Sequence, residues 1–348
     1  MHNHEPQRGR REFLRTAIAA AACALVRPGM PEASASSDLK VMTVTGEAPV
    51  DSLGAVLPHE HILVDFIGAD KSGKHRYDPD EVFRAVLPYL TQARKLGLGA
   101  LFECTPAYLG RDPVLLRRLS KASGVKIVTN TGLYGAAADK FLPAYAFRET
   151  AEQLAKRWTA EWEHGAEGSG IRPGFIKIGV DPEPSETDMK LAEAAALTHL
   201  RTGLTIASHT GAGKAAKLQI EALKKMGVSP AAFVWVHAHA ESDAAMHIWA
   251  ARQGAWPEFD GLSPSSVEQH VRLVSRMKEE GTLDRVLVSH DAGWYSVGEG
   301  AGGFRPFDTL FTQFLPALSK AGLTDGEIKQ ITHSNPQRAF ARQVRRAE

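Results

Sequence analysis

The sequence predicts a single (β/α)₈ barrel over residues 36–348. Short apolar segments alternate with longer amphipathic ones through this whole part of the chain. Several of the apolar segments are bounded by Gly or Pro and rich in Val, Ile and Phe, as buried parallel strands are. Several also end on a polar side chain, which is where barrel enzymes carry their catalytic groups.

The elements follow one another in the order that a barrel requires. A doubly wound sheet is the structural competitor, but the first βα connection carries no G-x-G-x-x-G, which weakens its dinucleotide-binding version. The expected strands lie at residues 54–64, 98–105, 125–131, 174–180, 204–209, 233–238, 255–260 and 286–291. The expected helices lie at residues 80–96, 112–122, 149–164, 188–201, 215–226, 264–279, 307–320 and 325–341.

Composition sets few limits on the function. At 348 residues and 37.7 kDa the chain can form one large α/β barrel or two modest domains. A formal net charge of +1 gives no indication of a nucleic acid or an anionic membrane as a partner. Cys104 is the only cysteine outside the first 35 residues, so no internal disulfide is expected once these are removed.

Residues 1–35 have the features of an export signal. Residues 10–14 (Arg-Arg-Glu-Phe-Leu) form a twin-arginine pattern, the apolar run 17–26 is too short to span a membrane, and residues 33–35 offer a cleavage site. We therefore expect export by the twin-arginine machinery, a periplasmic mature protein and no integral membrane association. A basic disordered tail is the alternative, and lipid attachment at Cys23 stays open.

His59 and His61 are the first candidate metal ligands. In an extended segment, side chains two residues apart share a face, so both imidazoles can reach one ion while Glu60 points elsewhere. The same spacing also fits two partly solvated histidines, so this pair alone does not establish a metal site.

Lys177 lies inside the apolar run 175–180, which should be buried. Lysine is almost never fully buried without a partner, and desolvation lowers its pKa and favours the nucleophilic amine. Such an amine can form a Schiff base with a substrate, or react with carbon dioxide to give an anionic carbamate that can bridge two cations. The alternative is a side chain that extends to solvent at the barrel opening.

His209 and His237 each follow an apolar run, and His239 makes a second H-x-H pair with His237. Either member of that pair can be a ligand, and we favour His237 because it follows the apolar run directly. Asp291 closes the run 286–290. A carboxylate there is costly unless it is paired or binds metal, although a helix N-cap is the alternative.

Together these side chains fit a site for two divalent cations with nitrogen and oxygen ligands. Zinc suits these donors best, and Mn, Fe, Co or Ni are also compatible. Two adjacent cations can share a hydroxide whose pKa is depressed toward neutrality, and they can polarise the oxygen of an electrophile. The candidate ligands are His59, His61, Lys177, His209, His237 and Asp291.

From Val41 to Phe340 the chain resembles the phosphotriesterase family of the amidohydrolase superfamily. The matching stretches are residues 57–61, 110–113, 131–134, 174–177, 208–210, 259–261, 289–291 and 335–336. This resemblance implies that His59 and His61 hold the more buried metal together with Asp291. It also implies that His209 and His237 hold the more exposed one.

The resemblance further implies catalytic and substrate roles. Lys177 would be carboxylated and bridge both metals, while Asp291 would orient the bridging hydroxide and shuttle its proton. Tyr134 lies where lactone-hydrolysing relatives place a tyrosine near the metals. Trp294, in a loop of its own sequence, is a second candidate to contact substrate, with packing within the loop as the alternative.

The substrate is less well defined than the site. Quorum-signal lactonases of the family carry an arginine after the segment matched by Phe259-Asp260, where this chain has Gly261. The expected activity is hydrolysis of a lactone or carboxylic ester, with phosphotriester cleavage as a promiscuous reaction. The alternatives are a non-catalytic, metal-containing ligand-binding protein and a metal-free, aldolase-like barrel with a Schiff base on Lys177. A homodimer is compatible with the family.

Overall fold

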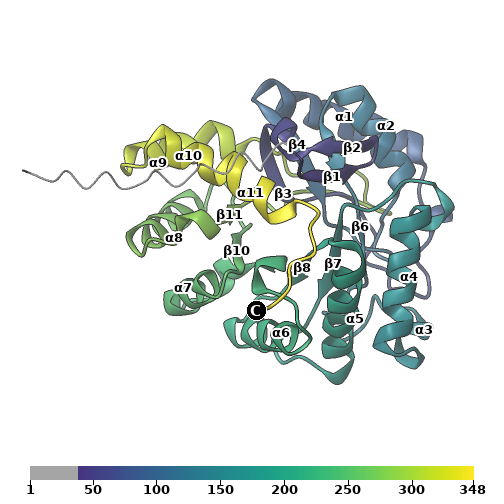
Figure 1. Ribbon diagram of the computed structural model, residues 1–348. Helices are drawn as coiled ribbons and strands as arrows, with labels where there is room; N and C mark the ends of the chain where they lie inside the picture. The colour runs from purple at the N-terminus through teal and green to yellow at the C-terminus, as the bar shows by residue number, and fades with distance from the viewer. Residues whose placement is uncertain (1–37) are drawn as a thin grey trace, which may run out of the picture. The chain divides into compact units, whose positions relative to one another are not determined.

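The computed structural model describes residues 38–348, so the predicted leader at residues 1–35 lies outside the described residues. The described part confirms the (β/α) barrel (Figure 1). Its wall consists of β3 (Ala55–Val64), β4 (Leu98–Glu103), β5 (Lys126–Val128) with β6 (Asn130–Thr131), β7 (Phe175–Gly179), β8 (Thr205–His209), β9 (Phe233–Val236), β10 (Trp256–Phe259) and β11 (Leu287–Val288).

The strands pair in parallel and close into a ring. One group has the order β11-β10-β9-β8-β7-β6, and the other joins β3, β4 and β5 with β12 (Gly293–Ser296) at its edge. The groups meet where β5 runs into β6 through Thr129. They meet again where the N–H of Asp291 donates to the carbonyl of His59 at 3.1 Å. The carboxyl ends of all these strands therefore surround one opening, which we call the barrel mouth.

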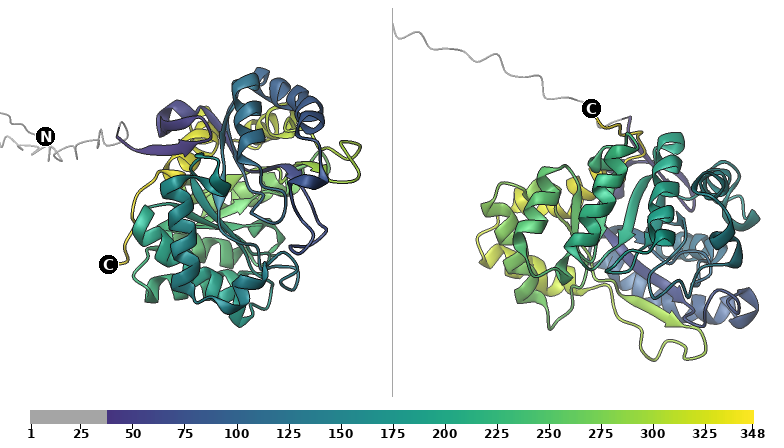
Figure 2. Two further views of the ribbon diagram at one scale, coloured as in Figure 1. Left: turned by 90° about the vertical axis from the view of Figure 1, so that its right-hand side faces the viewer. Right: turned by 90° about the horizontal axis from the view of Figure 1, so that it is seen from below.

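Helices cover the outside of this ring (Figure 2). They are α1 (Pro79–Lys95), α2 (Pro113–Ser123), α3 (Ala144–Arg148), α4 (Ala151–His164), α5 (Glu186–Thr202), α6 (Gly213–Lys225), α7 (Ala244–Arg252), α8 (Val267–Glu279), α9 (Leu315–Lys320), α10 (Asp325–Lys329) and α11 (Asn335–Phe340). Within residues 38–348, none of the helices combines the length and the apolar run that crossing a bilayer needs.

The start signals of the helices are in the sequence. Asp78 and Asp112 cap α1 and α2 with their carboxylates, and a proline follows each at the first helical position. α7 was not predicted because its apolar residues surround the helix instead of following one face. The hairpin of β1 (Lys40–Thr43) and β2 (Gly46–Pro49) was not predicted either.

Some predicted boundaries were wrong. The strand expected at residues 233–238 ends at Val236, and the one expected at 286–291 is only Leu287–Val288. The helix expected at residues 307–320 begins with a π-helical turn at Leu310–Phe314, and the one expected at 325–341 is divided by another at Gln330–Ser334. These differences lie at the element ends, where the chain turns to place functional side chains or to pack against the barrel.

Alternation along the strands sorts the side chains into two layers. On β7, Ile176 and Ile178 face the helices, whereas Phe175 belongs to the cluster inside the barrel. That inner cluster is closed by α11, whose Phe340 packs on Phe102 with ring centroids 4.2 Å apart. We call Phe102, Phe175, Trp256 and Phe340 the barrel floor. Lys177 follows Phe175 by two residues, so it points inward one layer nearer the mouth.

Candidate metal centre

The structure brings the six candidate ligands together around one cavity at the barrel mouth. β3 carries two of them, and β7 and β8 carry one each. His237 directly follows β9, and Asp291 lies in the segment that follows β11. The cavity has a volume of about 70 Å³. Its lining includes His59, His61, Lys177, His209, His237 and Asp291.

His59, His61 and Asp291 form the tightest group. The Nε2 atoms of the two histidines lie 3.2 Å apart, and Nε2 of His61 lies 3.1 Å from Oδ1 of Asp291. That oxygen is buried and has no hydrogen-bond partner among the described residues. A buried carboxylate oxygen without a partner is costly. The convergence of these three atoms therefore fits a bound cation.

A hydroxyl fixes the orientation of His61. Thr105 donates its single proton to Glu103 at 2.5 Å, so its oxygen accepts from Nδ1 of His61 at 2.8 Å. With its proton on Nδ1, His61 directs the Nε2 lone pair into the cavity. This is the arrangement that metal-binding histidines need.

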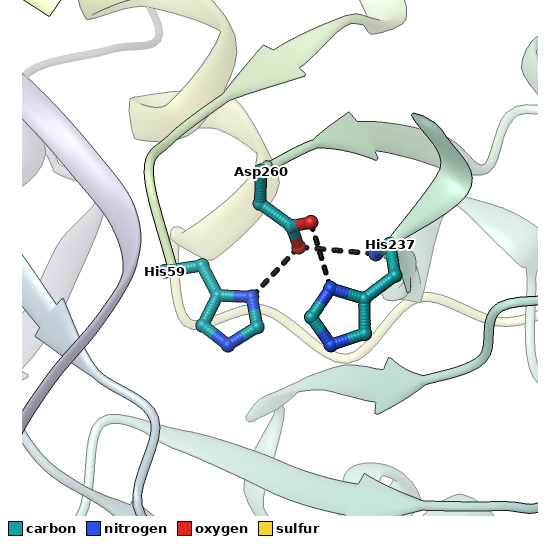
Figure 3. Close-up of side chains that lie close together, drawn as sticks. All are labelled: His59, His237 and Asp260. Atoms are coloured by element: carbon teal, nitrogen blue, oxygen red, sulfur yellow. Dashed lines mark hydrogen bonds and ion pairs between the residues drawn. The ribbon is translucent and has the colours of Figure 1, made fainter. Parts of the chain in front are cut away.

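Asp260 fixes two more histidines in the same way (Figure 3). Its Oδ2 accepts from Nδ1 of His59 at 2.7 Å, and its Oδ1 accepts from Nδ1 of His237 at 2.8 Å. Burial by itself raises the pKa of Asp260, but His237 and His59 hold that pKa well below its usual value. The Asp260 carboxylate thus keeps the proton of both rings on Nδ1, which leaves the Nε2 lone pairs of His59 and His237 free to bind a cation.

Sequence reasoning missed this role of Asp260. The sequence did contain a signal for it. Asp260 directly follows the segment that forms β10, just as Asp291 directly follows the apolar run 286–290. Asp260 is also grouped with His59 and His237 as a possible metal-binding set. It does not line the cavity, however, and its oxygens are engaged by the ring N–H groups. Its position behind the histidines indicates a supporting role.

Lys177 lines the same cavity as the other five candidate ligands. Only 2% of its surface is exposed. Burial, with the nearby Lys177 charge, lowers the pKa of His59 to about 4. Burial, His237 and Lys177 together lower the pKa of His209 well below its usual value. Both histidines are therefore neutral near pH 7 and can donate lone pairs.

Asp291 is anionic over the whole neutral range. Burial alone would raise its pKa, but the hydrogen-bonding contact with His61 and the neighbouring imidazole of His59 hold that pKa below its usual value. Its backbone has φ 52°, in the left-handed region that non-glycine residues rarely adopt. His237, at φ 64°, shares this conformation. Such local strain is often concentrated where a fold directs side chains into a functional site.

His237 and His239 have different surroundings. The rings of His237 and His209 lie 4.3 Å apart, and both residues line the cavity. His239 does not line it, and its Nδ1 lies 3.0 Å from Asp260. A Cβ atom on Gly261 would lie 2.3 Å from Nε2 of His239. His239 therefore occupies the space that a side chain at position 261 would need, and the geometry favours His237 as the ligand.

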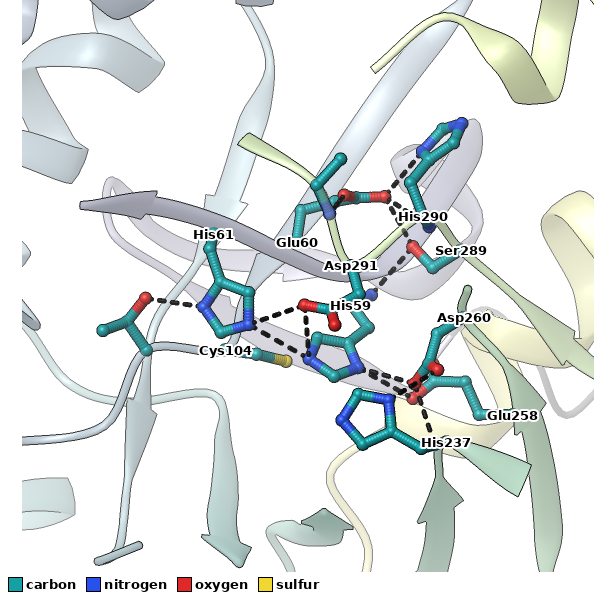
Figure 4. Close-up of polar contacts among 12 residues, drawn as sticks. His59, Glu60, His61, Cys104, His237, Glu258, Asp260, Ser289, His290 and Asp291 are labelled. Atoms are coloured by element: carbon teal, nitrogen blue, oxygen red, sulfur yellow. Dashed lines mark hydrogen bonds and ion pairs between the residues drawn. The ribbon is translucent and has the colours of Figure 1, made fainter. Parts of the chain in front are cut away.

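Glu60 points away from the cavity, as expected from alternation (Figure 4). Its carboxylate accepts from the Ser289 hydroxyl at 2.7 Å, from Nδ1 of His290 at 2.8 Å and from the Ala292 N–H at 2.8 Å. These bonds fasten the segment around Asp291 to β3, and they hold His290 outside the lining of the cavity.

Glu258 is a second buried acid that sequence reasoning missed. It lies 3.7 Å from Nδ1 of His59, and neither of its oxygens has a hydrogen-bond partner among the described residues. Burial and the neighbouring Asp260 raise the pKa of Glu258 well above its usual value. Its buried position beneath the site therefore favours the neutral form of this acid.

Aromatic and aliphatic side chains form the rest of the cavity wall. The Tyr134 ring packs against His209 at 5.0 Å, and the Trp294 ring packs against His61 at 5.5 Å. Phe66 lies against Trp294 at 5.3 Å, a contact that the sequence did not reveal. Both residues singled out as substrate contacts thus line the cavity, beside Val64, Pro106 and Leu109.

Known proteins with the same architecture have similar sequences. A "Phosphotriesterase homology protein" of Escherichia coli is 25% identical over 295 residues, covering 83% of this chain and 99% of its own length. An N-acetyltaurine hydrolase of Homo sapiens is 26% identical over 340 residues, covering 85% and 96%. An aryldialkylphosphatase of Saccharolobus solfataricus is 25% identical over 316 residues, covering 86% and 99%.

Solved structures agree with these sequence matches. A triple mutant of the organophosphorus hydrolase from Deinococcus radiodurans superimposes with a TM-score of 0.78 at 27% identity, covering 88% of this chain and 98% of the other. A sequence model described as "Phosphotriesterase family" matches residues 39–340. Since that match spans nearly all of the barrel, this chain belongs to the phosphotriesterase family, whose fold here carries the His/Asp clusters of a metal-dependent hydrolase.

Proposed function

We propose that this protein hydrolyses an ester bond, in a lactone or a carboxylic ester, with two divalent cations held by the six candidate ligands. The observation that carries the proposal is the convergence of these side chains on one mostly apolar cavity. When bound, such a cation pair supplies Lewis-acid activation of the substrate oxygen and makes water acidic near neutral pH. Zinc suits the nitrogen and oxygen donors best.

Lys177 acts in this proposal as a carbamate. Its amine adds to carbon dioxide, an Nζ–C bond forms, and one proton is released. The resulting anion would supply oxygen donors to cations held in the cavity that Lys177 lines together with His59 and His209.

Asp291 orients the attacking water and accepts its proton at Oδ1. That oxygen is anionic, unpaired among the described residues and 3.1 Å from His61. Tyr134 and Trp294 position the acyl part of the substrate against the wall of the cavity and keep other water away. Phosphotriesters, on which relatives act by their names, are expected as promiscuous substrates.

Metal titration followed by activity assays tests the function. Metal-free protein is reconstituted with zinc, manganese or cobalt and assayed on lactones, aryl esters and dialkyl aryl phosphotriesters. We expect metal-dependent turnover of an ester or lactone. Full metal occupancy without turnover in any class would contradict hydrolysis, and would favour a non-catalytic binding protein if ligands still bind. Borohydride trapping of a carbonyl compound on Lys177 in metal-free protein would favour the Schiff-base alternative.

We also propose that the protein is exported by the twin-arginine route and acts in the periplasm. The support is the sequence of residues 10–35. Replacing both Arg10 and Arg11 with lysine should leave the full-length protein in the cytoplasm, as seen by cell fractionation. Unchanged periplasmic activity in the double variant would overturn this assignment.

A further inference from the structure

Arg305 lies at the rim of the cavity, and none of the functions described so far uses it. Its backbone pairs with that of Gly293. The Arg305 N–H donates to the Gly293 carbonyl at 2.9 Å, and the Gly293 N–H donates to the Arg305 carbonyl at 3.0 Å. Gly293 sits between Asp291 and Trp294, both of which line the cavity. The fold therefore brings Arg305 to this border by backbone pairing, independently of its side chain.

The guanidinium group is held in place by two contacts. It lies over the Trp294 ring, 4.9 Å from the centroid, and its Nη2 donates to the backbone carbonyl of Asp291. Stacking on an aromatic face and a directed hydrogen bond restrict the plane of a guanidinium. The group is thus oriented at the rim before any ligand arrives.

Most of the binding capacity of this guanidinium is unused. Arginine has five N–H donors, and a single contact, to the Asp291 carbonyl, is found among the described residues. No carboxylate within residues 38–348 forms an ion pair with Arg305. Some other exposed arginines do have such partners: Arg157 pairs with Glu149 at 2.6 Å and Arg276 with Glu280 at 2.7 Å. The positive charge at the rim is therefore not neutralised by the protein.

Apart from the six candidate ligands, which the cations would occupy, the described residues that line the cavity include no charged side chain. Around Trp294 its walls are formed by the apolar side chains of Phe66, Val64 and Leu109. An anionic substituent that is not itself bound by the cations therefore has its best partner at the rim. There, water and a guanidinium that suits two-oxygen anions are both available.

We propose that Arg305 determines substrate specificity, and that the substrate is an ester or lactone carrying an anionic substituent such as a carboxylate or a sulfonate. This inference rests on the proposed hydrolase function and deepens it. The anion binds to the free N–H groups of Arg305 while the ester group reaches the six ligands. The competing explanation is that Arg305 only fastens the loop to Trp294, in which case substrate charge has no effect.

Matched pairs of substrates test the proposal. The pairs are phenyl acetate with para-acetoxybenzoate, and γ-butyrolactone with its γ-carboxy derivative, each assayed with the metal-loaded enzyme. We expect kcat/KM to favour the anionic member, and the ratio to fall roughly ten-fold in Arg305→Met, mainly through KM. Arg305→Lys keeps the charge and should retain part of the preference, whereas a loop-fastening role predicts no such rescue. Added salt should reduce the preference in the wild type.

A matched control is available elsewhere in the chain. Arg172 lies over the Trp162 ring at 5.5 Å, in the same kind of contact but outside the lining of the cavity. Arg172→Met should leave the ratio unchanged. Thermal melting of each variant shows whether it folds, so a loss of preference is read only from folded protein.

Binding measurements separate this inference from the proposed function. Calorimetry compares glutarate with its neutral diamide on zinc-loaded wild-type protein and on Arg305→Met. Glutarate binding that weakens about ten-fold in the variant, with the diamide unaffected, supports the anion site even if no ester is hydrolysed. An equal response to both ligands, or a substrate ratio unchanged by Arg305→Met, would overturn it.

Discussion

The two ends of the barrel are built from opposite kinds of side chain. The floor packs aromatic rings: Phe175 lies 5.6 Å from Phe102 and 5.7 Å from Phe340. The mouth buries a lysine, carboxylates and histidines, and holds two ligand positions in a left-handed conformation. Phe175 and Lys177 belong to the same strand and face the same way. The comparison shows that one strand carries a residue that stabilises the fold, Phe175, and a candidate metal ligand, Lys177, only two positions apart.

The largest expected effect is at the mouth, from Lys177→Ala. Loss of the bridging group should remove both cations and with them several kcal/mol of transition-state stabilisation, on the order of a thousand-fold or more in kcat. Metal content by mass spectrometry and turnover of a reactive aryl ester measure both effects. The free energy of unfolding of the metal-free protein should not fall, because the substitution also removes the cost of burying the amine.

Acetate provides a check on the same variant. A small carboxylate that fills the vacated position should restore part of the metal occupancy and of the rate. If Lys177→Ala kept full metal content and full activity, the carbamate would be wrong, and the contrast between mouth and floor would lose its main support.

The floor should respond in the opposite way. Phe340→Ala removes a ring packed on Phe102 and Phe175, which should cost about 3–5 kcal/mol in the free energy of unfolding. Urea denaturation of the metal-free protein measures this cost. Zinc affinity of the folded fraction should stay close to the wild-type value. A large loss of zinc affinity would show that the two ends are coupled.

An intermediate effect is expected behind the ligands. Asp260→Asn keeps the shape of the side chain but loses its charge, and the amide nitrogen cannot accept from a ring N–H. Second-layer carboxylates of this kind typically contribute 10- to 100-fold in metal affinity, so we expect about that loss here. Competition with a chelator measures it. An unchanged affinity would mean that His59 and His237 are oriented by the backbone alone.

The smallest effect is a pH dependence outside the ligand set. Burial lowers the pKa of His270 to about 4, against 6.5 when unfolded. Between these values the unfolded chain binds more protons, so His270 contributes stability above pH 6.5 that is lost as the pH falls toward 4. His270→Gln should reduce this acid-induced loss by about 1–2 kcal/mol. Urea unfolding at pH 7 and at pH 4.5 measures the difference, and an identical loss in both proteins would contradict the assignment.

The barrel was predictable because its pattern is local. Apolar runs such as 175–180 and 204–209 carry both the strand signal and the inward alternation that places Lys177 and His209. The elements that were missed lack such a signal. α7 is apolar on most sides, and β12 is extended because it pairs with β3, a contact distant in sequence.

The candidate site also has residues that the sequence predicts and residues that it does not. The six candidate ligands are visible in the sequence because a polar residue inside or just after an apolar run is unusual. Asp260, Thr105 and Arg305 are not, because their importance comes from what they touch. The Thr105 hydroxyl orients His61 only once β3 and β4 lie side by side, and Arg305 reaches Trp294 only through its pairing with Gly293.

Anomalous diffraction at the zinc edge, on crystals of the zinc-loaded mature protein, tests the central claim most directly. We expect two peaks at the barrel mouth, one among His59, His61 and Asp291 and one beside His209 and His237, with additional density on Nζ of Lys177 between them. A fully loaded protein whose zinc lies elsewhere, or whose mouth shows no anomalous peak, would contradict the account.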